Sequence, residues 1–184
     1  MNPSHNLFLI GPTGAGKTSI GRRLAAHYGL SFIDLDQEIE RHCGVDVNTV
    51  FEIEGEAGFR QRESALLDEC SQRSGVLLAT GAGVVLATHN RQHLRERGYV
   101  VWLQTTIEQQ LERLERDHRR PLLAVPDRHE RLQAMAQVRA PLYRDLADLA
   151  VPGEHGSVAA ASDRCIALID HHWQRPGAVP RHTA

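Results

Sequence analysis

The sequence predicts an α/β domain in which a parallel β-sheet is covered by helices. Short apolar runs alternate with amphipathic stretches along the 184 residues, which is the pattern that builds such a sheet. Hydrophobic residues make up 41% and charged residues 24% of the chain, a balance typical of one globular domain with a sufficient core. We expect this domain over residues 1–173, followed at 174–184 by a disordered tail with two prolines and little apolar content.

Five short apolar runs are predicted to be the strands, because amphipathic stretches and turn residues separate them. They are Asn6–Ile10, Ser31–Ile33, Val76–Thr80, Tyr99–Leu103 and Leu149–Val151. Their alternation with helical stretches is typical of a sheet whose strands run in the same direction.

The stretches between the strands carry apolar residues at helical spacing, and each is expected to bury one stripe on the sheet. The stretch after the fourth strand shows this pattern in Ile107, Leu111 and Leu114. Thr105 and Glu108 stand at capping-box spacing ahead of that stripe. We therefore expect a capped helix to begin there.

Charge and cysteine content exclude several classes of protein. A net charge of -2 and a pI near 6.6 provide no excess positive field to hold nucleic acid or an anionic membrane, so phosphate recognition must be local. Cys43, Cys70 and Cys165 lie far apart without CxxC spacing, which argues against disulfides and a zinc site. No export signal and no long apolar span is visible, so we expect a cytoplasmic protein.

The first strand runs directly into residues 11–18, Gly-Pro-Thr-Gly-Ala-Gly-Lys-Thr, a full match to the phosphate-binding pattern G-x-x-x-x-G-K-[ST]. Glycines let successive N–H groups point inward, and the following helix adds its positive N-terminus. Lys17, the only lysine, is expected to neutralise the β- and γ-phosphates of ATP, and the Thr18 hydroxyl to bind Mg²⁺. The predicted nucleotide-binding residues here are Gly14, Ala15, Gly16, Lys17, Thr18 and Ser19. The alternative is a strand-to-helix turn without function, which this context disfavours.

Two carboxylates, Asp34 and Asp36, stand at the end of the second predicted strand. In open α/β sheets the carboxyl ends of the strands face the ligand crevice. A carboxylate there can orient Mg²⁺ through water or accept a proton from an attacking hydroxyl. The alternative is a helix cap, a common role of aspartate. We favour the functional role for Asp36.

Arg60 lies in a helical stretch beside the stripe that begins at Phe59, where it can reach the crevice and be held by Glu63 three residues later. A solvated surface charge is the alternative, and the residues alone favour neither. Residues 80–83, Thr-Gly-Ala-Gly, end the third apolar run and could offer N–H donors to an anion. There the alternative is a tight turn without a ligand.

Two more arginines are candidates. Arg120 lies in segment 115–129, which is charged, rich in arginine and broken by Pro121 and Pro126, so it is predicted to be a mobile excursion between two helices. A closing flap there could bring a guanidinium onto the transferring phosphate. Arg139 lies in an amphipathic helix, where a surface ion pair is the default interpretation.

The whole set of motifs resembles the shikimate kinase family over about residues 6–170. The segments that carry the resemblance, in order, are residues 11–18, FIDLD at 32–36, FRQRE at 59–63, ATGAG at 79–83, RRPLL at 119–123 and VRAPLY at 138–143. The resemblance implies a P-loop NTPase three-layer sandwich with strand order 2-3-1-4-5, substrate-binding helices at about 36–62 and a lid at about 115–129. It also implies transfer of the γ-phosphoryl of ATP to the 3-hydroxyl of shikimate.

The same resemblance implies roles for individual residues. Asp36 matches the aspartate that binds the shikimate hydroxyls and accepts the proton, and Asp34 matches the one near Mg²⁺. Arg60 and Arg139 match the pair that holds the substrate carboxylate, which suits guanidinium forks. Arg120 matches the lid arginine that contacts the ATP phosphates. The expected catalytic residues are Lys17, Asp36 and Arg120; the expected substrate-binding residues are Asp36, Arg60, Gly81, Ala82, Gly83 and Arg139.

The chain departs from the family at Ala82, where the family usually has glycine. Alanine keeps the backbone N–H but disfavours a positive φ, so the change weakens substrate binding only if φ must be positive there. The resemblance places the adenine-contacting loop near residues 152–157 and suggests a monomer.

Two other functions stay open on the sequence. The first is a kinase for another polar metabolite, such as gluconate or a nucleoside monophosphate, since the phosphate-binding loop does not choose the acceptor. The second is a nucleotide-dependent switch without an acceptor. A GTPase switch is excluded, because its N-K-x-D motif needs a second lysine.

Overall fold

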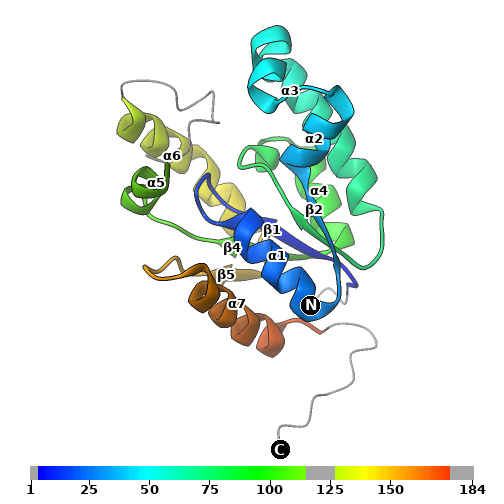
Figure 1. The fold of residues 1–184 in the computed structure, drawn as a ribbon, viewed down its shortest axis with the longest axis vertical. Coiled ribbons are helices and arrows are strands. Elements are labelled where there is room, and N and C mark those ends of the chain that lie inside the picture. Colours follow the sequence, from blue (N-terminus) through cyan, green and yellow to red (C-terminus); the bar gives the residue numbers. More distant parts are fainter. Residues whose placement is uncertain (1–3, 115–126, 175–184) are drawn as a thin grey trace, which may run out of the picture.

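Five parallel strands form one sheet in the order β2-β3-β1-β4-β5, as expected (Figure 1). The structure is a computed structural model that describes residues 4–114 and 127–174. β1 lies at the centre of the sheet, with Leu7 opposite Leu77 on one side and Tyr99 on the other. The carboxyl ends of all five strands therefore meet at one edge.

The elements follow the predicted alternation. They are β1 (Leu7–Ile10), α1 (Lys17–Tyr28), β2 (Ser31–Asp34), α2 (Leu35–Cys43), α3 (Val47–Ser71), β3 (Val76–Ala79), the 3-10 helix η1 (Val84–Leu86), α4 (Thr88–Arg97), β4 (Tyr99–Leu103), α5 (Ile107–Leu114), α6 (Arg128–Leu146), β5 (Leu149–Val151) and α7 (Val158–His172). All five predicted strands are present. Their ends agree with the predictions to within one residue, since Asn6 and Thr80 lie just outside β1 and β3 and Asp34 extends β2.

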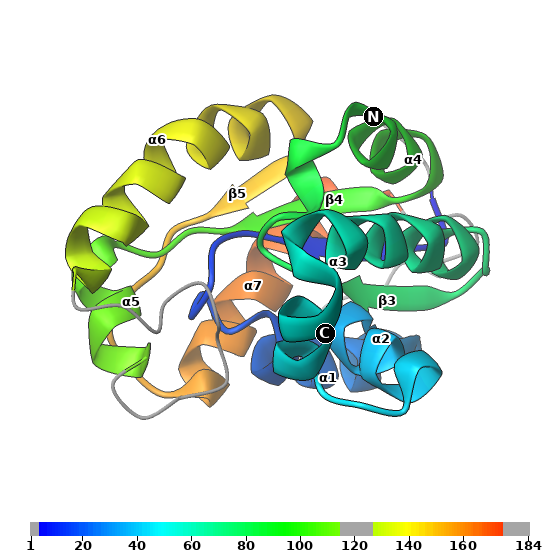
Figure 2. The ribbon, with the colours of Figure 1, turned by 90° about the horizontal axis from the view of Figure 1, so that it is seen from above.

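The two faces of the sheet are covered by different helices (Figure 2). Alternation along β1 sends Phe8 and Ile10 to one face and Leu7 and Leu9 to the other, and all four are fully buried. The first pair packs with residues of α2, α3, α4 and α6, and the second pair with α1 and α7. Helices on both faces explain why the central strand is apolar throughout.

The stripe on α5 does not pack on the sheet, contrary to the prediction. Leu114 is buried against Leu132 of α6, and Ile107 and Leu111 pack against the same small cluster. Gln109, also on α5, is buried with 4% exposure and contacts Gly153 in the loop between β5 and α7. Helical spacing shows that a helix has an apolar stripe, but the partner of that stripe is a tertiary choice.

The cap of α5 is one residue later than predicted. Thr106 accepts a hydrogen bond from the Gln109 backbone N–H at 3.2 Å, and the Gln109 side chain accepts one from the Thr106 N–H at 3.2 Å. This is a reciprocal capping box on Thr106 and Gln109 instead of Thr105 and Glu108. Both pairs have the required spacing, and the burial of Gln109 selects the one that forms.

The range predicted for the substrate-binding helices, about 36–62, covers α2 and the part of α3 up to Arg62. Gly55, inside α3, has φ 67° and ψ -177°, which breaks the helix into two parts. A backbone in that region is reached almost only by glycine. The part of α3 before Gly55 therefore leaves the direction set by the long second part.

The predicted lid and tail fall largely outside the described residues. The described chain has a helix on each side of the predicted segment 115–129, since α5 ends at Leu114. However, α6 already begins at Arg128, so the last two residues of the predicted excursion are helical. Residues 115–126, with Arg120 among them, and residues 175–184 lie outside the described part of the chain. Within the described part, no helix combines the length and apolar character needed to cross a membrane.

Candidate active site

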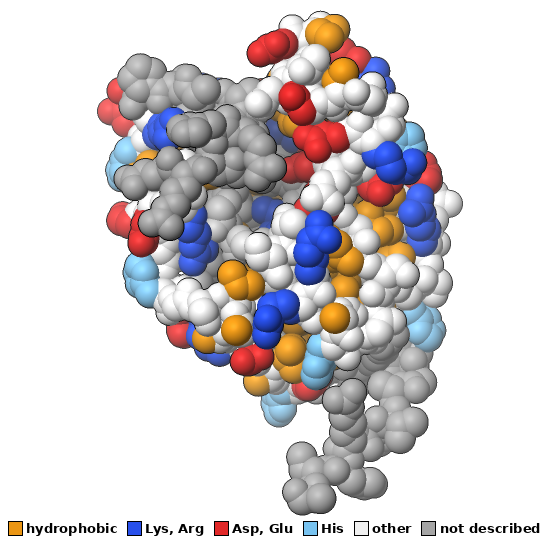
Figure 3. Space-filling model, viewed as in Figure 1, with side chains coloured by type: hydrophobic (Ala, Val, Ile, Leu, Met, Phe, Trp, Pro, Cys, Tyr) orange, Lys and Arg blue, Asp and Glu red, His pale blue; other side chains and the backbone are white. Residues whose placement is uncertain are grey.

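A cavity of about 560 Å³ opens at the carboxyl ends of the strands, where Figure 3 shows a hollow in one face of the molecule. Its walls come from the loop before α1, the ends of β2 and β4, the start of α2, and the loop between β5 and α7. The crevice thus lies at the edge where open α/β sheets bind ligands. All six residues predicted from the phosphate-binding pattern, 14–19, line it.

The loop before α1 is wound tightly by three glycines with positive φ: Gly11 at 142°, Gly14 at 76° and Gly16 at 88°. At Gly11 there is also no space for a side chain, because a β-carbon there would collide with the Leu103 carbonyl oxygen. Glycine is needed at these positions for its backbone freedom. The wound loop leads directly into α1, so its backbone and the helix N-terminus form one cradle whose geometry suits an anion.

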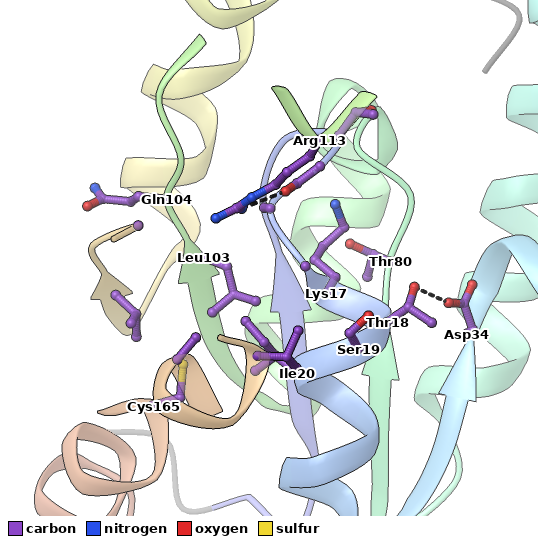
Figure 4. A pocket seen from close by; sticks show the side chains of 18 of the residues that line it. Lys17, Thr18, Ser19, Ile20, Asp34, Thr80, Leu103, Gln104, Arg113 and Cys165 are labelled. Carbon is purple, nitrogen blue, oxygen red and sulfur yellow. Dashed lines mark hydrogen bonds between the residues drawn. The ribbon is translucent and has the colours of Figure 1, made fainter. Parts of the chain in front are cut away.

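Lys17 folds over this loop. Its Nζ donates hydrogen bonds to the carbonyl oxygens of Gly11 and Pro12, both at 2.8 Å. Figure 4 shows the side chain rising from the start of α1 toward Arg113, with Thr80 beside it. The positive charge predicted for the phosphates is therefore placed at the mouth of the cradle.

Thr18 and Asp34 are in direct contact. The Thr18 hydroxyl donates to Asp34 Oδ2 at 2.6 Å (Figure 4). Asp34 Oδ1 accepts from the backbone N–H groups of Asp36 and Gln37 at 3.1 and 3.3 Å, so the capping role considered for this residue is confirmed. One carboxylate thus both caps α2 and faces the cavity.

The Thr18 and Asp34 oxygens fit a small hard cation. A hydroxyl and one carboxylate beside a phosphate cradle are the oxygen ligands that Mg²⁺ takes when the substrate phosphates and waters supply the rest. In the described residues no group of three or more His, Cys, Asp or Glu side chains forms a self-sufficient metal site. Any divalent cation here is therefore expected to depend on a phosphate ligand.

Arg113 is a site residue that the sequence analysis missed. Its Nη1 donates to the Gly14 carbonyl oxygen at 2.8 Å, which links α5 to the loop before α1. The Arg113 side chain lines the cavity (Figure 4). The charge of Arg113 adds to that of Lys17 beside the cradle. The one sequence signal for this role is the position of Arg113 in the last turn of the helix after β4. That signal is weak, because an arginine at such a position is usually solvated.

A second cluster of charges lies beside the cavity, where Arg60 meets Glu63. Arg60 Nη1 donates to Glu63 Oε2 at 2.6 Å, which confirms the predicted contact, and Nη2 donates to Glu56 at 3.2 Å. The Glu63 side chain is only 1% exposed. Burial raises the pKa of Glu63, and the neighbouring Arg60 guanidinium opposes this shift.

The side chains of Asp36, Glu63 and Arg60 pack against the backbone of the turn after β3. A β-carbon at Gly81 would collide with Glu63 Oε1 and lie 3.2 Å from Asp36 Oδ1, and one at Gly83 would collide with the Arg60 guanidinium. Among the described residues only glycines have a positive φ, so φ of Ala82, between Gly81 and Gly83, is negative. The departure from glycine at Ala82 is therefore compatible with the backbone.

Arg139 is buried, so the surface ion pair expected by default is wrong. The residue is 9% exposed, in the middle of α6. Burial lowers its pKa, and Tyr143 opposes this shift while Arg60 adds to it. A guanidinium held in a poorly solvated position near another guanidinium is well suited to bind an anion.

The structure thus brings together most of the predicted acceptor residues. Asp36, in the first turn of α2, lines the cavity and approaches Gly81, while the charges of Asp36, Arg60 and Arg139 all influence the pKa of Glu63. Arg120 lies outside the described residues. The segments involved are spread over more than 100 residues of sequence and meet because their strands end at the same edge.

The predicted adenine-contacting loop also reaches the cavity. Five of its six residues, 152–154 and 156–157, line the same wall. Gly153 has no room for a side chain because a β-carbon would collide with the Gln104 carbonyl oxygen, and Gln109 donates to the Gly153 carbonyl oxygen at 3.5 Å. Gln109, which was not predicted, therefore links α5 to this loop.

Comparisons with known proteins agree with this geometry. A sequence profile of the family described as Shikimate kinase matches residues 13–170. A shikimate kinase of Pasteurella multocida (strain Pm70) is 45% identical over 172 residues, covering 93% of this chain and 98% of that protein. One from Actinobacillus succinogenes is 46% identical with the same coverage.

A solved structure shares the fold closely. The shikimate kinase from Acinetobacter baumannii in complex with shikimate has a TM-score of 0.88 and 42% identity, covering 91% of this chain and 94% of that one. The matched profile includes nearly all of the phosphate-binding loop together with Arg60 and Arg139. The chain therefore belongs to the shikimate kinase family.

Proposed function

We propose that the protein is a shikimate kinase, which transfers the γ-phosphoryl of ATP to the 3-hydroxyl of shikimate and gives shikimate 3-phosphate and ADP. The observation that carries the proposal is the place of Arg60, Arg139 and Asp36 beside the phosphate-binding cavity. Two guanidinium groups and a carboxylate suit an acceptor with one carboxylate and several hydroxyls. The family membership and the related structure in complex with shikimate support the same acceptor.

ATP is expected to bind with its phosphates in the cradle before α1. Lys17 exchanges its two loop carbonyl contacts for the β- and γ-phosphates, and Arg113 adds a second positive charge. The loop at 152–157 offers the opposite wall for the base. Phosphoryl transfer requires mainly positioning and charge neutralisation, which these groups supply.

Thr18 would hold Mg²⁺ directly and Asp34 would hold it through water. The metal would supply charge neutralisation on the β- and γ-phosphates. Thr18 and Asp34 already lie within a hydrogen bond of each other, so the chain does not need to rearrange to present both oxygens to one cation.

The acceptor would bind between α3, α6 and the turn after β3. Arg60 and Arg139 hold its carboxylate, and the backbone N–H groups of residues 81–83 contact it from the turn. Asp36 binds the hydroxyls and accepts the proton of the attacking 3-hydroxyl. Arg120 is proposed, from the resemblance alone, to contact the ATP phosphates during transfer.

The test is ADP release from ATP and Mg²⁺, with and without shikimate, by the wild-type protein and by Asp36→Asn. We expect turnover that depends on shikimate, is lost in Asp36→Asn and is also lost in Lys17→Ala. Nucleotide binding by Asp36→Asn, measured separately, should persist because the cradle is built from the loop before α1 and the start of that helix. Turnover in Asp36→Asn equal to wild type would reduce Asp36 to a structural residue.

The same assay separates the other candidate functions. Turnover with gluconate or a nucleoside monophosphate, and none with shikimate, would reject the proposed acceptor and retain the kinase. Slow ATP hydrolysis that no acceptor stimulates would favour a nucleotide-dependent switch. Sedimentation and cell fractionation test two further proposals, that the protein acts as a monomer and in the cytoplasm.

A further inference from the structure

One hydrogen bond joins the two elements that surround the proposed acceptor site. The Tyr143 hydroxyl, from the last turns of α6, donates to the carbonyl oxygen of Ala82 in the turn after β3. The bond is buried, and Tyr143 is 2% exposed. The two residues are 61 positions apart in the sequence, so the bond fixes a tertiary relationship and not a local one.

The Ala82 carbonyl and the Gly83 N–H belong to one rigid trans peptide unit, so they point in opposite directions. Holding the carbonyl toward α6 therefore also sets the direction of the Gly83 N–H. The turn has little other freedom, because Glu63 and Arg60 are packed directly on Gly81 and Gly83. A rotation of this peptide would move the N–H and disturb the charged groups on either side.

Tyr143 is itself held firmly. Its ring stacks on Trp102 of β4, with ring centroids 5.8 Å apart and an interplanar angle of 29°. Burial raises its pKa above its ordinary value of 10, so the hydroxyl is a protonated donor at neutral pH and well above it. A donor on a fixed ring imposes one orientation on its acceptor, whereas a flexible side chain would follow it.

Tyr143 also lies beside Arg139. The residues are four apart on α6, so their side chains share one face of the helix, and both line a small cavity of about 180 Å³ that Pro12 of the phosphate-binding loop also lines. The charge of Arg139 and the phenol influence each other's pKa, as expected for groups in proximity. The same tyrosine is thus next to one anion-binding side chain and bonded to the turn that supplies backbone donors.

We propose that Tyr143 is a positioning residue for the acceptor, acting through its hydroxyl. By its bond to Ala82 it aligns the turn of residues 81–83 with Arg139, so that backbone donors and guanidinium act on the same molecule. This inference rests on the proposed function for the identity of the acceptor. It does not assign Tyr143 any contact with substrate or any part in proton transfer.

The test compares Tyr143→Phe with a matched control, Tyr99→Phe. Tyr143→Phe keeps the ring and its stacking on Trp102 but removes the donor. Tyr99 is also buried, at 3% exposure, but it begins β4 at the opposite end of the strands from the site. Both variants remove the hydroxyl of a buried tyrosine, so a general effect of that change appears in both.

We expect Tyr143→Phe to raise KM for shikimate about tenfold, as the loss of one buried hydrogen bond allows. KM for ATP should stay within about twofold of wild type, and Tyr99→Phe should change neither constant. An unchanged KM for shikimate in Tyr143→Phe would overturn the proposal. So would equal increases in both KM values, because they would indicate a general structural role.

A second readout does not depend on the acceptor. Amide hydrogen exchange at Ala82 and Gly83 should be at least about tenfold faster in Tyr143→Phe than in the wild type and in Tyr99→Phe, because the turn loses its anchor. Equal exchange in all three proteins would overturn the inference. If exchange is faster in Tyr143→Phe alone but the wild type shows no turnover with shikimate, the positioning of the turn stands and the proposed acceptor fails.

Discussion

At the scale of single residues, the candidate site depends on small residues that leave room for large charged side chains. Gly81 and Gly83 leave room for the Glu63 carboxylate and the Arg60 guanidinium directly against the backbone. Ala82 between them carries a side chain and has an ordinary negative φ. The glycines of this turn are therefore required for close approach, and not for unusual dihedral angles.

Gly83→Ala is expected to raise KM for the acceptor about tenfold, because the new β-carbon displaces the Arg60 guanidinium from its position on the turn. Steady-state kinetics with shikimate as the varied substrate measure this. Ala82→Gly is the matched control in the same turn and should remain within about twofold of wild type. Similar constants for Gly83→Ala and wild type would show that Arg60 does not need this position.

Glu63 predicts a pH dependence of stability. Burial raises its pKa above the ordinary 4.5, so in this range the folded protein binds the proton more tightly than the unfolded chain. Its contribution to stability is complete below pH 4.5 and is lost as pH rises through the folded pKa. Between pH 5 and 8 the free energy of unfolding of Glu63→Gln should therefore fall less steeply than that of the wild type. The two slopes should differ by up to about 1.4 kcal/mol per pH unit.

Urea unfolding at several pH values measures this difference, and Glu54→Gln is the control. Glu54 is a more exposed carboxylate whose pKa is lowered by its hydrogen bond to Arg62, so its contribution is lost as pH falls. The two variants should change the pH profile in opposite directions. Profiles parallel to wild type for Glu63→Gln would contradict the prediction.

At the scale of elements, the break in α3 determines how the helix covers the site. Gly55 divides the helix, and Arg62 donates to Glu54 at 2.7 Å across the break. Before the break, Phe51 stacks on Phe59, which follows it, with ring centroids 4.4 Å apart. These two contacts hold the first part of α3 against the second part, with Phe51 packed on Phe59, the residue next to Arg60.

Gly55→Ala should lower the free energy of unfolding by about 1–3 kcal/mol, since alanine resists this backbone conformation even though nothing lies within 4 Å of its β-carbon. Urea unfolding and acceptor KM should both be measured, and we expect KM to rise as the Phe51 contact shifts. The control is Gly29→Ala, which substitutes another glycine of positive φ, the C-cap of α1. It should lose about 1–2 kcal/mol of stability without changing KM. A stable Gly55→Ala would show that the break is not required.

At the scale of the whole molecule, the sheet separates two apolar clusters that each contain one buried cysteine. Cys70 belongs to the cluster with α3, α4 and α6, and Cys165 to the cluster with α1 and α7. Burial raises the pKa of Cys165 to about 11 and also raises that of Cys70. Both thiols are therefore protected from alkylation, because the thiolate is the reactive form.

We expect Cys70 and Cys165 to be alkylated at the same slow rate, at least about a thousandfold below the unfolded rate, if both faces open only with the whole domain. Cys43, which is partly buried at the end of α2, should react first. Mass spectrometry of peptides after timed alkylation measures all three. Different rates at Cys70 and Cys165 would show that the faces open separately.

Local patterns in the sequence predicted the elements and the glycine-rich loop that lines the cavity. Strand ends came out within one residue, and residues 14–18 of the phosphate-binding pattern line the cavity as expected. The reason is that periodicity, glycine spacing and a sole lysine act within a few residues of each other. The sheet order and the roles of distant residues came from the resemblance to a family.

Only the tertiary structure decided which of several equally suitable residues are used. It selected Thr106 with Gln109 as the cap of α5, turned the α5 stripe toward α6 and buried Arg139. It also joined Tyr143 to Ala82. Spacing in the sequence gives each of these residues a capacity to cap, pack or bind, whereas burial and long-range contact determine its partner, because both depend on segments that meet only when the sheet is assembled.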